Sequence, residues 1–203
     1  MTRVGVLASG NGTNLQALID ALNREGSSVQ VAVTICNVPG AKALARAQQA
    51  GVATELLPSK GVTDRTAYDA QLVGLLHKHR IDLVCLAGYM RLLTPGFLQA
   101  FPNQVLNIHP SLLPAFPGMH AIRQALEAGV KVTGCTVHFV DEGTDTGPII
   151  AQTAVPVLDG DDENKLAERI HHQEHRLYPA VVSKLAAEPF SIQGRRVMTQ
   201  GAF

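Results

Sequence analysis

The sequence lacks a long apolar run, because stretches such as Leu83–Ala87 fall far short of the roughly 20 residues that a membrane-spanning helix needs. It also lacks an excess charge of either sign: 17 Lys and Arg balance 17 Asp and Glu, so no global field gathers nucleic acid or an anionic membrane. The first eight residues lack the apolar segment of a signal peptide. We therefore expect a cytoplasmic protein whose partners are small-molecule substrates, with no nucleic acid and no membrane among them.

Cysteine is scarce as well. Cys36, Cys85 and Cys135 are odd in number, lie far apart, and each sits within an apolar run. This pattern predicts small buried side chains and argues against a disulfide framework or a thiolate metal site. With 46% hydrophobic and 17% charged residues over 203 positions, the composition is that of a globular chain that can form one domain over residues 1–203.

The first half of the chain alternates apolar β-branched runs with helical patterns, which is typical of βαβ units in a parallel sheet with helices on both faces. The strands are expected at residues 3–8, 29–36, 53–57 and 83–87. The intervening helices are expected at residues 14–24, 41–50 and 64–80, where apolar residues recur every three or four positions.

The second half has a different pattern and predicts a mixed sheet. Strands are expected at residues 105–109, 133–140 and 149–157, with one helix near 120–128 and a hairpin-like link between the last two strands. An acidic cluster at 159–163 precedes a long amphipathic pattern that ends near Ala187, and acidic residues suit the start of a helix.

A glycine loop, Ser9–Asn14, lies between the first expected strand and the first expected helix, where backbone N–H groups can hold a phosphate. It begins like the dinucleotide fingerprint G-x-G-x-x-G, but Leu15 occupies the third glycine position and Asn37 replaces the acidic residue expected after the second strand. A monophosphate therefore suits this loop better than a pyrophosphate. The alternative is a plain tight turn, with Thr13 or Asn14 capping the helix.

A second polar segment follows the strand expected at 105–109. Asn107 and His109 alternate along that strand, so they should share a face at its carboxyl end, where open α/β sheets bind ligands. An amide donor beside an imidazole suits acyl transfer, in which an oxyanion is stabilised and a proton moves. The alternative is that His109 is a satisfied structural histidine.

A third segment, Asp141–Pro148, is a polar loop between two expected strands, and a carboxylate from it could reach His109 and raise the pKa of the imidazole. Solvated loop carboxylates are common, so spacing alone leaves this contact open.

Together, the three segments resemble the folate-dependent formyltransferases. The resemblance covers the chain from Val4 to Tyr178, with the pieces in matching order and spacing. The string from Asn107 to Pro114, Asn-Ile-His-Pro-Ser-Leu-Leu-Pro, is highly specific for this superfamily. The early Gly-Asn-Gly-Thr-Asn-Leu-Gln loop points to the branch that acts on glycinamide ribonucleotide. The sequence departs from some relatives at Ala115 and Phe116.

The resemblance implies a Rossmann-like formyltransferase fold, mostly a parallel sheet, with 10-formyltetrahydrofolate as co-substrate and no metal. The N-terminal half would bind the ribonucleotide phosphate, and the C-terminal half would bind folate and carry the catalysis. Asn107 and protonated His109 would hold the oxyanion, with Asp145 keeping His109 charged. The ribonucleotide would be bound by Gly12, Thr13, Asn14 and Glu174. The folate site would be lined by Arg65, Met90, Arg91, Leu92, Leu93 and Asn107. Homodimers are the commonest soluble assembly and are the default to test.

Four alternatives remain at this stage. His171–His175 matches the zinc-peptidase pattern H-x-x-E-H, although the third ligand that a catalytic zinc needs is not evident. A formyltetrahydrofolate deformylase would share the catalytic trio and use water as acceptor. A formyltransferase that acts on tRNA would share the Asn-x-His string, but such an enzyme is larger and has an additional C-terminal domain. A nucleotide-binding module without catalysis would leave the trio incidental, and the separation of His109 and Asp145 distinguishes that case.

Overall fold

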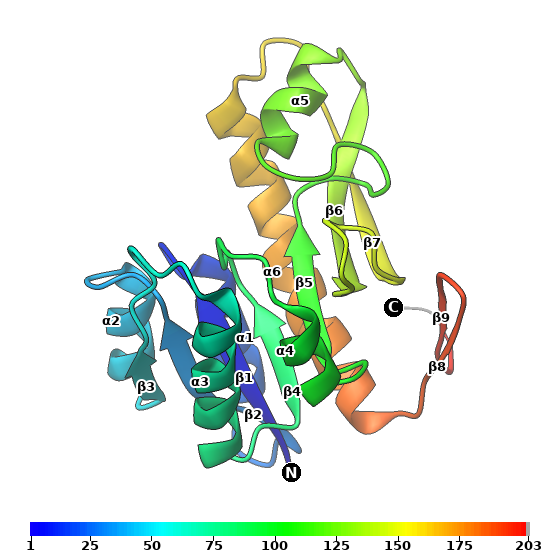
Figure 1. Cartoon of the computed structure of the whole chain (residues 1–203). Coiled ribbons are helices and arrows are strands. Elements are labelled where there is room, and N and C mark those ends of the chain that lie inside the picture. The colour runs from blue at the N-terminus through cyan, green and yellow to red at the C-terminus, as the bar shows by residue number, and fades with distance from the viewer. Residues whose placement is uncertain (202–203) are drawn as a thin grey trace. The chain divides into compact units, whose positions relative to one another are not determined.

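The computed structural model describes residues 1–201 and divides into two compact units, with the boundary between Leu106 and Asn107 inside strand β5 (Val105–His109) (Figure 1). Both units combine helices and strands, which confirms the expected α/β class. The expectation of one domain over residues 1–203 stays a prediction.

The first unit alternates strands and helices along the chain. Its elements are β1 (Thr2–Ala8), α1 (Thr13–Leu22), β2 (Val29–Cys36), α2 (Lys42–Gln49), β3 (Ala53–Leu56), α3 (Arg65–Lys78), β4 (Leu83–Leu86) and α4 (Pro95–Ala100). The expected strands and helices are confirmed to within a few residues at each end.

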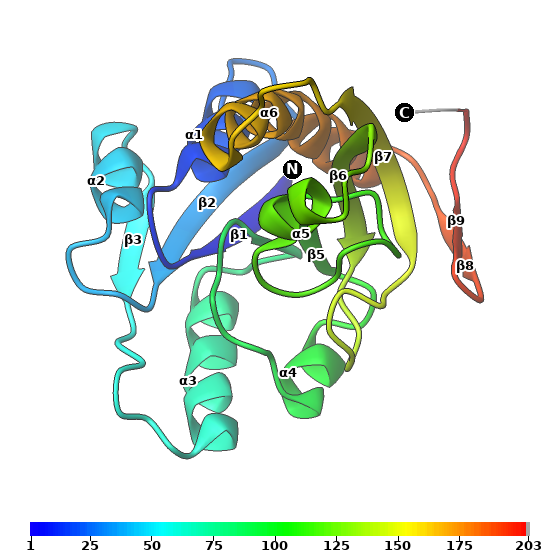
Figure 2. The same cartoon turned by 90° about the horizontal axis from the view of Figure 1, so that it is seen from above.

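The sheet of this unit is entirely parallel. Strand β1 pairs with β2 on one side and β4 on the other, and β2 pairs with β3. The chain therefore steps outward from β1 to β3 and then returns to β4, so right-handed crossovers place α1 and α3 on opposite faces. Figure 2 shows these two helices on either side of the strands. Because both faces are covered, β1 is buried continuously from Val4 to Ala8 without alternation.

The second unit has the mixed sheet that its sequence predicts. Its elements after β5 are α5 (Ala121–Glu127), β6 (Val132–Phe139), β7 (Ile149–Pro156), α6 (Glu163–Ala187), β8 (Ser191–Gln193) and β9 (Arg196–Met198). Strand β6 lies between β5 and β7, and β6 and β7 are antiparallel. Strand β9 pairs with β7 in parallel and with β8 antiparallel.

Helix α6 packs on β6 and β7, and its core contacts include Leu166 and Ile170 with Cys135 and Val155. It begins as expected after an acidic cluster, because the Asp162 carboxylate accepts a hydrogen bond from Lys165 N at 2.8 Å and caps the helix. This cap and the apolar face fix the long helix against the sheet that carries β6.

Three local features differ from the sequence prediction. Helix α4 was not predicted, although Thr94 caps the helix and Pro95 stands in its first turn. The β8–β9 hairpin was not predicted either, because strands of three residues are too short for alternation to be recognised. Neither Thr13 nor Asn14 caps α1. Its N-cap is Gly12, which has φ 72° and makes no side-chain capping bond.

Position 12 favours glycine for two reasons. Its φ is positive, and a Cβ atom built there would lie 2.7 Å from Cα of Ala43, so only glycine fits between the loop and the start of α2. All three cysteines are buried, as predicted. Within residues 1–201, no helix is long and apolar enough to cross a membrane.

Candidate active site

Asn107 and His109 occupy alternate positions at the carboxyl end of β5, as the sequence predicts. His109 is buried, whereas Asn107 is partly exposed. The backbone period of two places both side chains on one face of the strand. An amide and an imidazole are therefore held side by side by the strand geometry alone.

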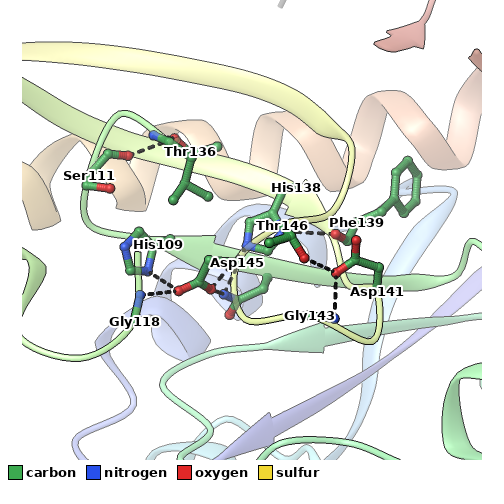
Figure 3. Close-up of polar contacts among 12 residues, drawn as sticks. His109, Ser111, Gly118, Thr136, His138, Phe139, Asp141, Gly143, Asp145 and Thr146 are labelled. Carbon is green, nitrogen blue, oxygen red and sulfur yellow. Dashed lines mark hydrogen bonds and ion pairs between the residues drawn. The ribbon is translucent and has the colours of Figure 1, made fainter. Parts of the chain in front are cut away.

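The loop between β6 and β7 is folded by its own polar side chains. Oδ1 of Asp141 accepts hydrogen bonds from Gly143 N at 3.1 Å and from Thr146 Oγ1 at 2.6 Å (Figure 3). At Gly147 any Cβ atom would collide with the carbonyl oxygen of Phe139. These constraints bring Asp145 inward in a left-handed conformation, φ 55°, that aspartate tolerates better than most residues.

Asp145 contacts both residues of the strand end. Its Oδ2 lies 3.3 Å from Nδ1 of His109, and Asn107 Nδ2 donates to its Oδ1 at 3.5 Å. The same Oδ2 accepts a 2.7 Å hydrogen bond from Gly118 N (Figure 3). The structure therefore brings the predicted trio of Asn107, His109 and Asp145 together, and an incidental arrangement loses its support.

A second histidine, His138, completes this cluster and was not predicted from the sequence. Its Nδ1 donates to the Phe139 carbonyl at 2.8 Å, and its Nε2 lies 3.2 Å from Asn107 Nδ2 and 3.6 Å from Asp145 Oδ1. Because Nδ1 is the donor to that carbonyl, Nε2 accepts from the Asn107 amide when the ring is neutral and donates toward Asp145 Oδ1 when the ring is protonated. The available signal was an ionisable residue at the end of β6, just before the polar loop.

The charge of Asp145 is stabilised by these neighbours. Burial alone would raise the pKa of its carboxyl, but hydrogen bonds from His138 and Gly118 and the charges of His109 and His138 outweigh burial and lower that pKa. The carboxylate is therefore ionised at neutral pH, which is the state that stabilises a neighbouring imidazolium.

The glycine loop after β1 is in the first unit, and Ser9 ties it to two neighbouring strand ends. Ser9 Oγ donates to Asn37 Oδ1 at 2.6 Å and accepts from Met90 N at 2.9 Å. Asn37, where a dinucleotide-binding chain would carry an acid, is thus a structural link between β1 and β2. Beyond Ser9, Gly12, Thr13 and Asn14 form the start of α1, whose first amides have no acceptor within the helix.

The predicted folate-lining residues of the first unit also lie together. Arg65 donates from NH2 to the Leu92 carbonyl at 2.9 Å, and the Arg91 guanidinium stacks over the Tyr68 ring at 4.4 Å. Met90 and Leu92 are 70% and 60% exposed, which is unusual for two large apolar side chains so close in sequence. Leu93, which follows them, is partly buried.

Glu174 lies on α6 and is 3% exposed. Its negative charge is near Cys135, whose thiol pKa burial raises to about 12 with a further contribution from Glu174. The rings of His171 and His175, one helical turn apart, are 6.4 Å between centroids. Among the described residues, no group of three His, Cys, Asp or Glu side chains is placed to hold a metal ion.

Comparisons with known proteins give a consistent result. Residues 2–182 match the model of the formyl transferase family. The chain is 43% identical over 185 residues to phosphoribosylglycinamide formyltransferase of Bacillus subtilis (strain 168), covering 91% of this chain and 95% of that relative. It is 53% identical to the solved structure of glycinamide ribonucleotide transformylase 1 from Symbiobacterium toebii, with a TM-score of 0.96 and coverage of 99% and 95%.

A multifunctional relative matches over a smaller share of its length. The trifunctional purine biosynthetic protein adenosine-3 of Drosophila melanogaster is 51% identical over 185 residues, which is 90% of this chain but 14% of the fly protein. This chain therefore spans only a small part of that relative.

Proposed function

The chain belongs to the formyl transferase family, and from that premise we propose that it transfers the formyl group of 10-formyltetrahydrofolate to the primary amine of N1-(5-phosphoribosyl)glycinamide. The products are formylglycinamide ribonucleotide and tetrahydrofolate, as a step of purine biosynthesis. The names of the bacterial and fly relatives support this assignment, and the likeness to the Symbiobacterium structure confirms the expected formyltransferase fold.

The observation that carries the proposal is the position of Asp145 between Asn107 and His109. Formyl transfer passes through a tetrahedral intermediate that bears a negative oxygen, and preorganised donors stabilise that charge. The Asn107 amide and a protonated His109 supply the donors. The ionised Asp145 carboxylate stabilises the positive charge of the ring.

The bond changes balance with these groups alone. The amine lone pair forms the new C–N bond at the formyl carbon, and the carbonyl π pair moves onto oxygen. When the carbonyl re-forms, the bond to the folate nitrogen breaks, and that nitrogen keeps the electron pair and takes a proton from His109. The proton lost by the incoming amine returns to His109, so the ring ends as it began.

The two substrates use the predicted binding residues. In the first unit, Gly12, Thr13 and Asn14 bind the ribonucleotide phosphate through backbone amides at the start of α1. Glu174 accepts hydrogen bonds from the ribose hydroxyls. The folate wall consists of Arg65, Met90, Arg91, Leu92 and Leu93, all in the first unit. Asn107, in the second unit, is a separate folate-binding residue. Exposed Met90 and Leu92 offer apolar surface to a flat heterocycle.

Three properties accompany this function. The reaction needs no Lewis acid when an amide and an imidazolium stabilise the oxyanion, so dialysis against a chelator should leave turnover unchanged. The proposed location is the cytoplasm, as expected from the sequence. A homodimer is the assembly to expect, which light scattering of the purified protein measures directly.

The decisive experiment mixes the purified protein with 10-formyltetrahydrofolate and follows release of tetrahydrofolate, with and without the ribonucleotide. Release that requires the ribonucleotide, with stoichiometric formation of its formyl derivative, supports the proposal. Equal release in its absence would identify water as the acceptor and assign a deformylase. An Asp145→Asn variant serves as a control for non-enzymatic hydrolysis.

A further inference from the structure

The segment Phe116–Gly118 contacts both members of the His109–Asp145 pair through its backbone. The Phe116 carbonyl oxygen lies 2.8 Å from His109 Nε2, and the Gly118 N–H donates to Asp145 Oδ2 at 2.7 Å. A main-chain acceptor therefore contacts the Nε2 side of the imidazole, and a main-chain donor binds the carboxylate that lies on the Nδ1 side. We refer to Phe116–Gly118 as the backbone clamp.

Hydrogen-bond chemistry distinguishes the two nitrogens of His109. A carbonyl oxygen can only accept, so the nitrogen that faces it, Nε2, must carry a proton. Nδ1 faces a carboxylate at the longer distance of 3.3 Å. Loss of the Nε2 proton is opposed, because it would leave the lone pair of that nitrogen facing a carbonyl oxygen at 2.8 Å. Nδ1 faces the carboxylate that the Asn107 amide also contacts, so it is the nitrogen placed to exchange a proton beside the other catalytic groups.

From these contacts we propose that the backbone clamp fixes the Nε2 proton of His109, so that Nδ1 is the nitrogen that exchanges a proton during catalysis, and that Ser111 is the positioning residue that holds the clamp. The inference deepens the proposed formyl transfer and rests on it for its catalytic consequence. In the reaction, the Nδ1–H bond breaks, the proton passes to the departing folate nitrogen, and the electron pair stays on Nδ1. Nδ1 then takes the proton that the incoming amine loses.

Ser111 is suited to this task by burial and by its partners. It is fully buried, and its Oγ donates to the Ala115 carbonyl at 2.6 Å and lies 3.4 Å from the Phe116 carbonyl. Its own carbonyl accepts a 2.7 Å hydrogen bond from Thr136 Oγ1 on β6 (Figure 3). Ser111 thus links the Ala115 carbonyl, through its hydroxyl, to strand β6, through its own carbonyl.

The backbone of the clamp requires such a link. Phe116 has φ 53° and Gly118 has φ 78°, and the left-handed region disfavours a bulky residue such as phenylalanine. Without the Ser111 hydroxyl, the Ala115 carbonyl loses its hydrogen bond and the Phe116 carbonyl loses its 3.4 Å contact, so the backbone can shift and the Phe116 carbonyl no longer faces Nε2. The side of the ring that faces Asp145 is also the side of the Asn107 amide, which contacts the same carboxylate. Proton exchange and oxyanion stabilisation then occur at one place.

The test reads the two ring nitrogens directly, in the enzyme without substrates. Protein with ¹⁵N-labelled histidine is titrated from about pH 6 to about pH 9 by NMR, and His109 is assigned by comparison with His109→Gln. In the wild type we expect Nε2 to stay in the protonated shift range throughout, with any change confined to Nδ1. A wild-type spectrum in which Nε2 loses its proton overturns the proposal, whatever the variants do.

Variants then test the role of Ser111. Ser111→Ala should give a mixture of ring tautomers and lower kcat about tenfold, the equivalent of one lost hydrogen bond, with KM for the ribonucleotide unchanged. Phe116→Asn keeps the main-chain carbonyl and suits a left-handed φ, so Nε2 of His109 should stay protonated in this variant. Thr133→Val is the control, because it also removes a buried hydroxyl, but one that has no hydrogen-bond partner within residues 1–201. The His109 tautomer should be unchanged in this variant.

The outcomes separate this proposal from the proposed function. A Ser111→Ala protein with wild-type tautomers and wild-type kcat removes Ser111 from the positioning role. A mixture of tautomers in Thr133→Val would mean that loss of any buried hydroxyl disturbs the ring, and would overturn that role as well. Failure of formyl transfer to the ribonucleotide appears only in the activity assay, whereas the ring spectrum needs no substrate.

Discussion

Oδ2 of Asp145 lies 3.3 Å from Nδ1 of His109, although His109 ends strand β5 and Asp145 lies in the loop between β6 and β7. The contact depends on a loop that closes on itself through Asp141 and on a main-chain donor, Gly118 N, that holds the same oxygen. The carboxylate is thus positioned before any substrate arrives, which is the condition for electrostatic preorganisation.

Replacing Asp145 by Asn should preserve the shape of this contact and remove its charge. We expect kcat to fall by about 10²- to 10⁴-fold, the usual contribution of a positioned acid–base pair, with little change in ribonucleotide affinity. Steady-state kinetics and calorimetric titration of the ribonucleotide measure the two effects. Asp159→Asn, the same change at a side chain that is 97% exposed, is the control and should behave as wild type. Equal loss of kcat in both variants would contradict the role of Asp145.

The lowered pKa of Asp145 also predicts how stability depends on pH. Its folded-state pKa is below the unfolded value, so the carboxylate contributes stability that is fully present above the ordinary aspartate pKa of about 3.9 and is lost as pH falls through the folded value. Urea unfolding of wild type and Asp145→Asn at several acidic pH values measures this. The free energy of unfolding of the wild type should fall relative to the variant below about pH 4. A constant difference across that range would mean that the pKa of Asp145 is not lowered.

His138 should matter through the orientation of the Asn107 amide. His138→Leu removes the Nε2 acceptor that lies 3.2 Å from Asn107 Nδ2, and we expect a loss in kcat of about tenfold, smaller than that of Asp145→Asn. His138→Gln places an amide oxygen where Nε2 was and should recover most of the activity. If glutamine is as damaging as leucine, the hydrogen bond to Asn107 is not the cause.

The sequence predicted the parts of this site that depend on side-chain periodicity or on the resemblance. Asn107 and His109 follow from the alternation of a strand, and the resemblance singled out Asp145. His138 was missed because it lies in a strand that is buried at nearly every position, where a histidine has no distinguishing pattern. The Phe116 carbonyl and the Gly118 N–H were missed because main-chain contacts leave no residue type to recognise. Likewise, the β8–β9 hairpin depends on pairing with β7 rather than on its own three-residue strands.

The proposed folate wall in the first unit yields a further prediction, because one face of α3 contacts it at three points. Arg65, Tyr68 and Asp69 have the i, i+3, i+4 spacing of a helix face. Arg65 and Tyr68 contact Leu92 and Arg91, and buried Asp69 accepts from Thr94 N at 2.7 Å. The wall is therefore positioned by a carboxylate that needs no contact with substrate.

Asp69→Leu should leave the Thr94 N–H unsatisfied and release the end of the wall. We expect KM for 10-formyltetrahydrofolate to rise about tenfold, while kcat at saturating folate and KM for the ribonucleotide change little. Asp69→Asn retains an acceptor oxygen and should restore a KM near the wild-type value, which separates the hydrogen bond from the charge. Circular dichroism confirms that both variants are folded. An unchanged folate KM in a folded Asp69→Leu protein would show that the Asp69–Thr94 hydrogen bond does not position the wall, and an equal rise in both KM values would point to a general loosening of the first unit instead.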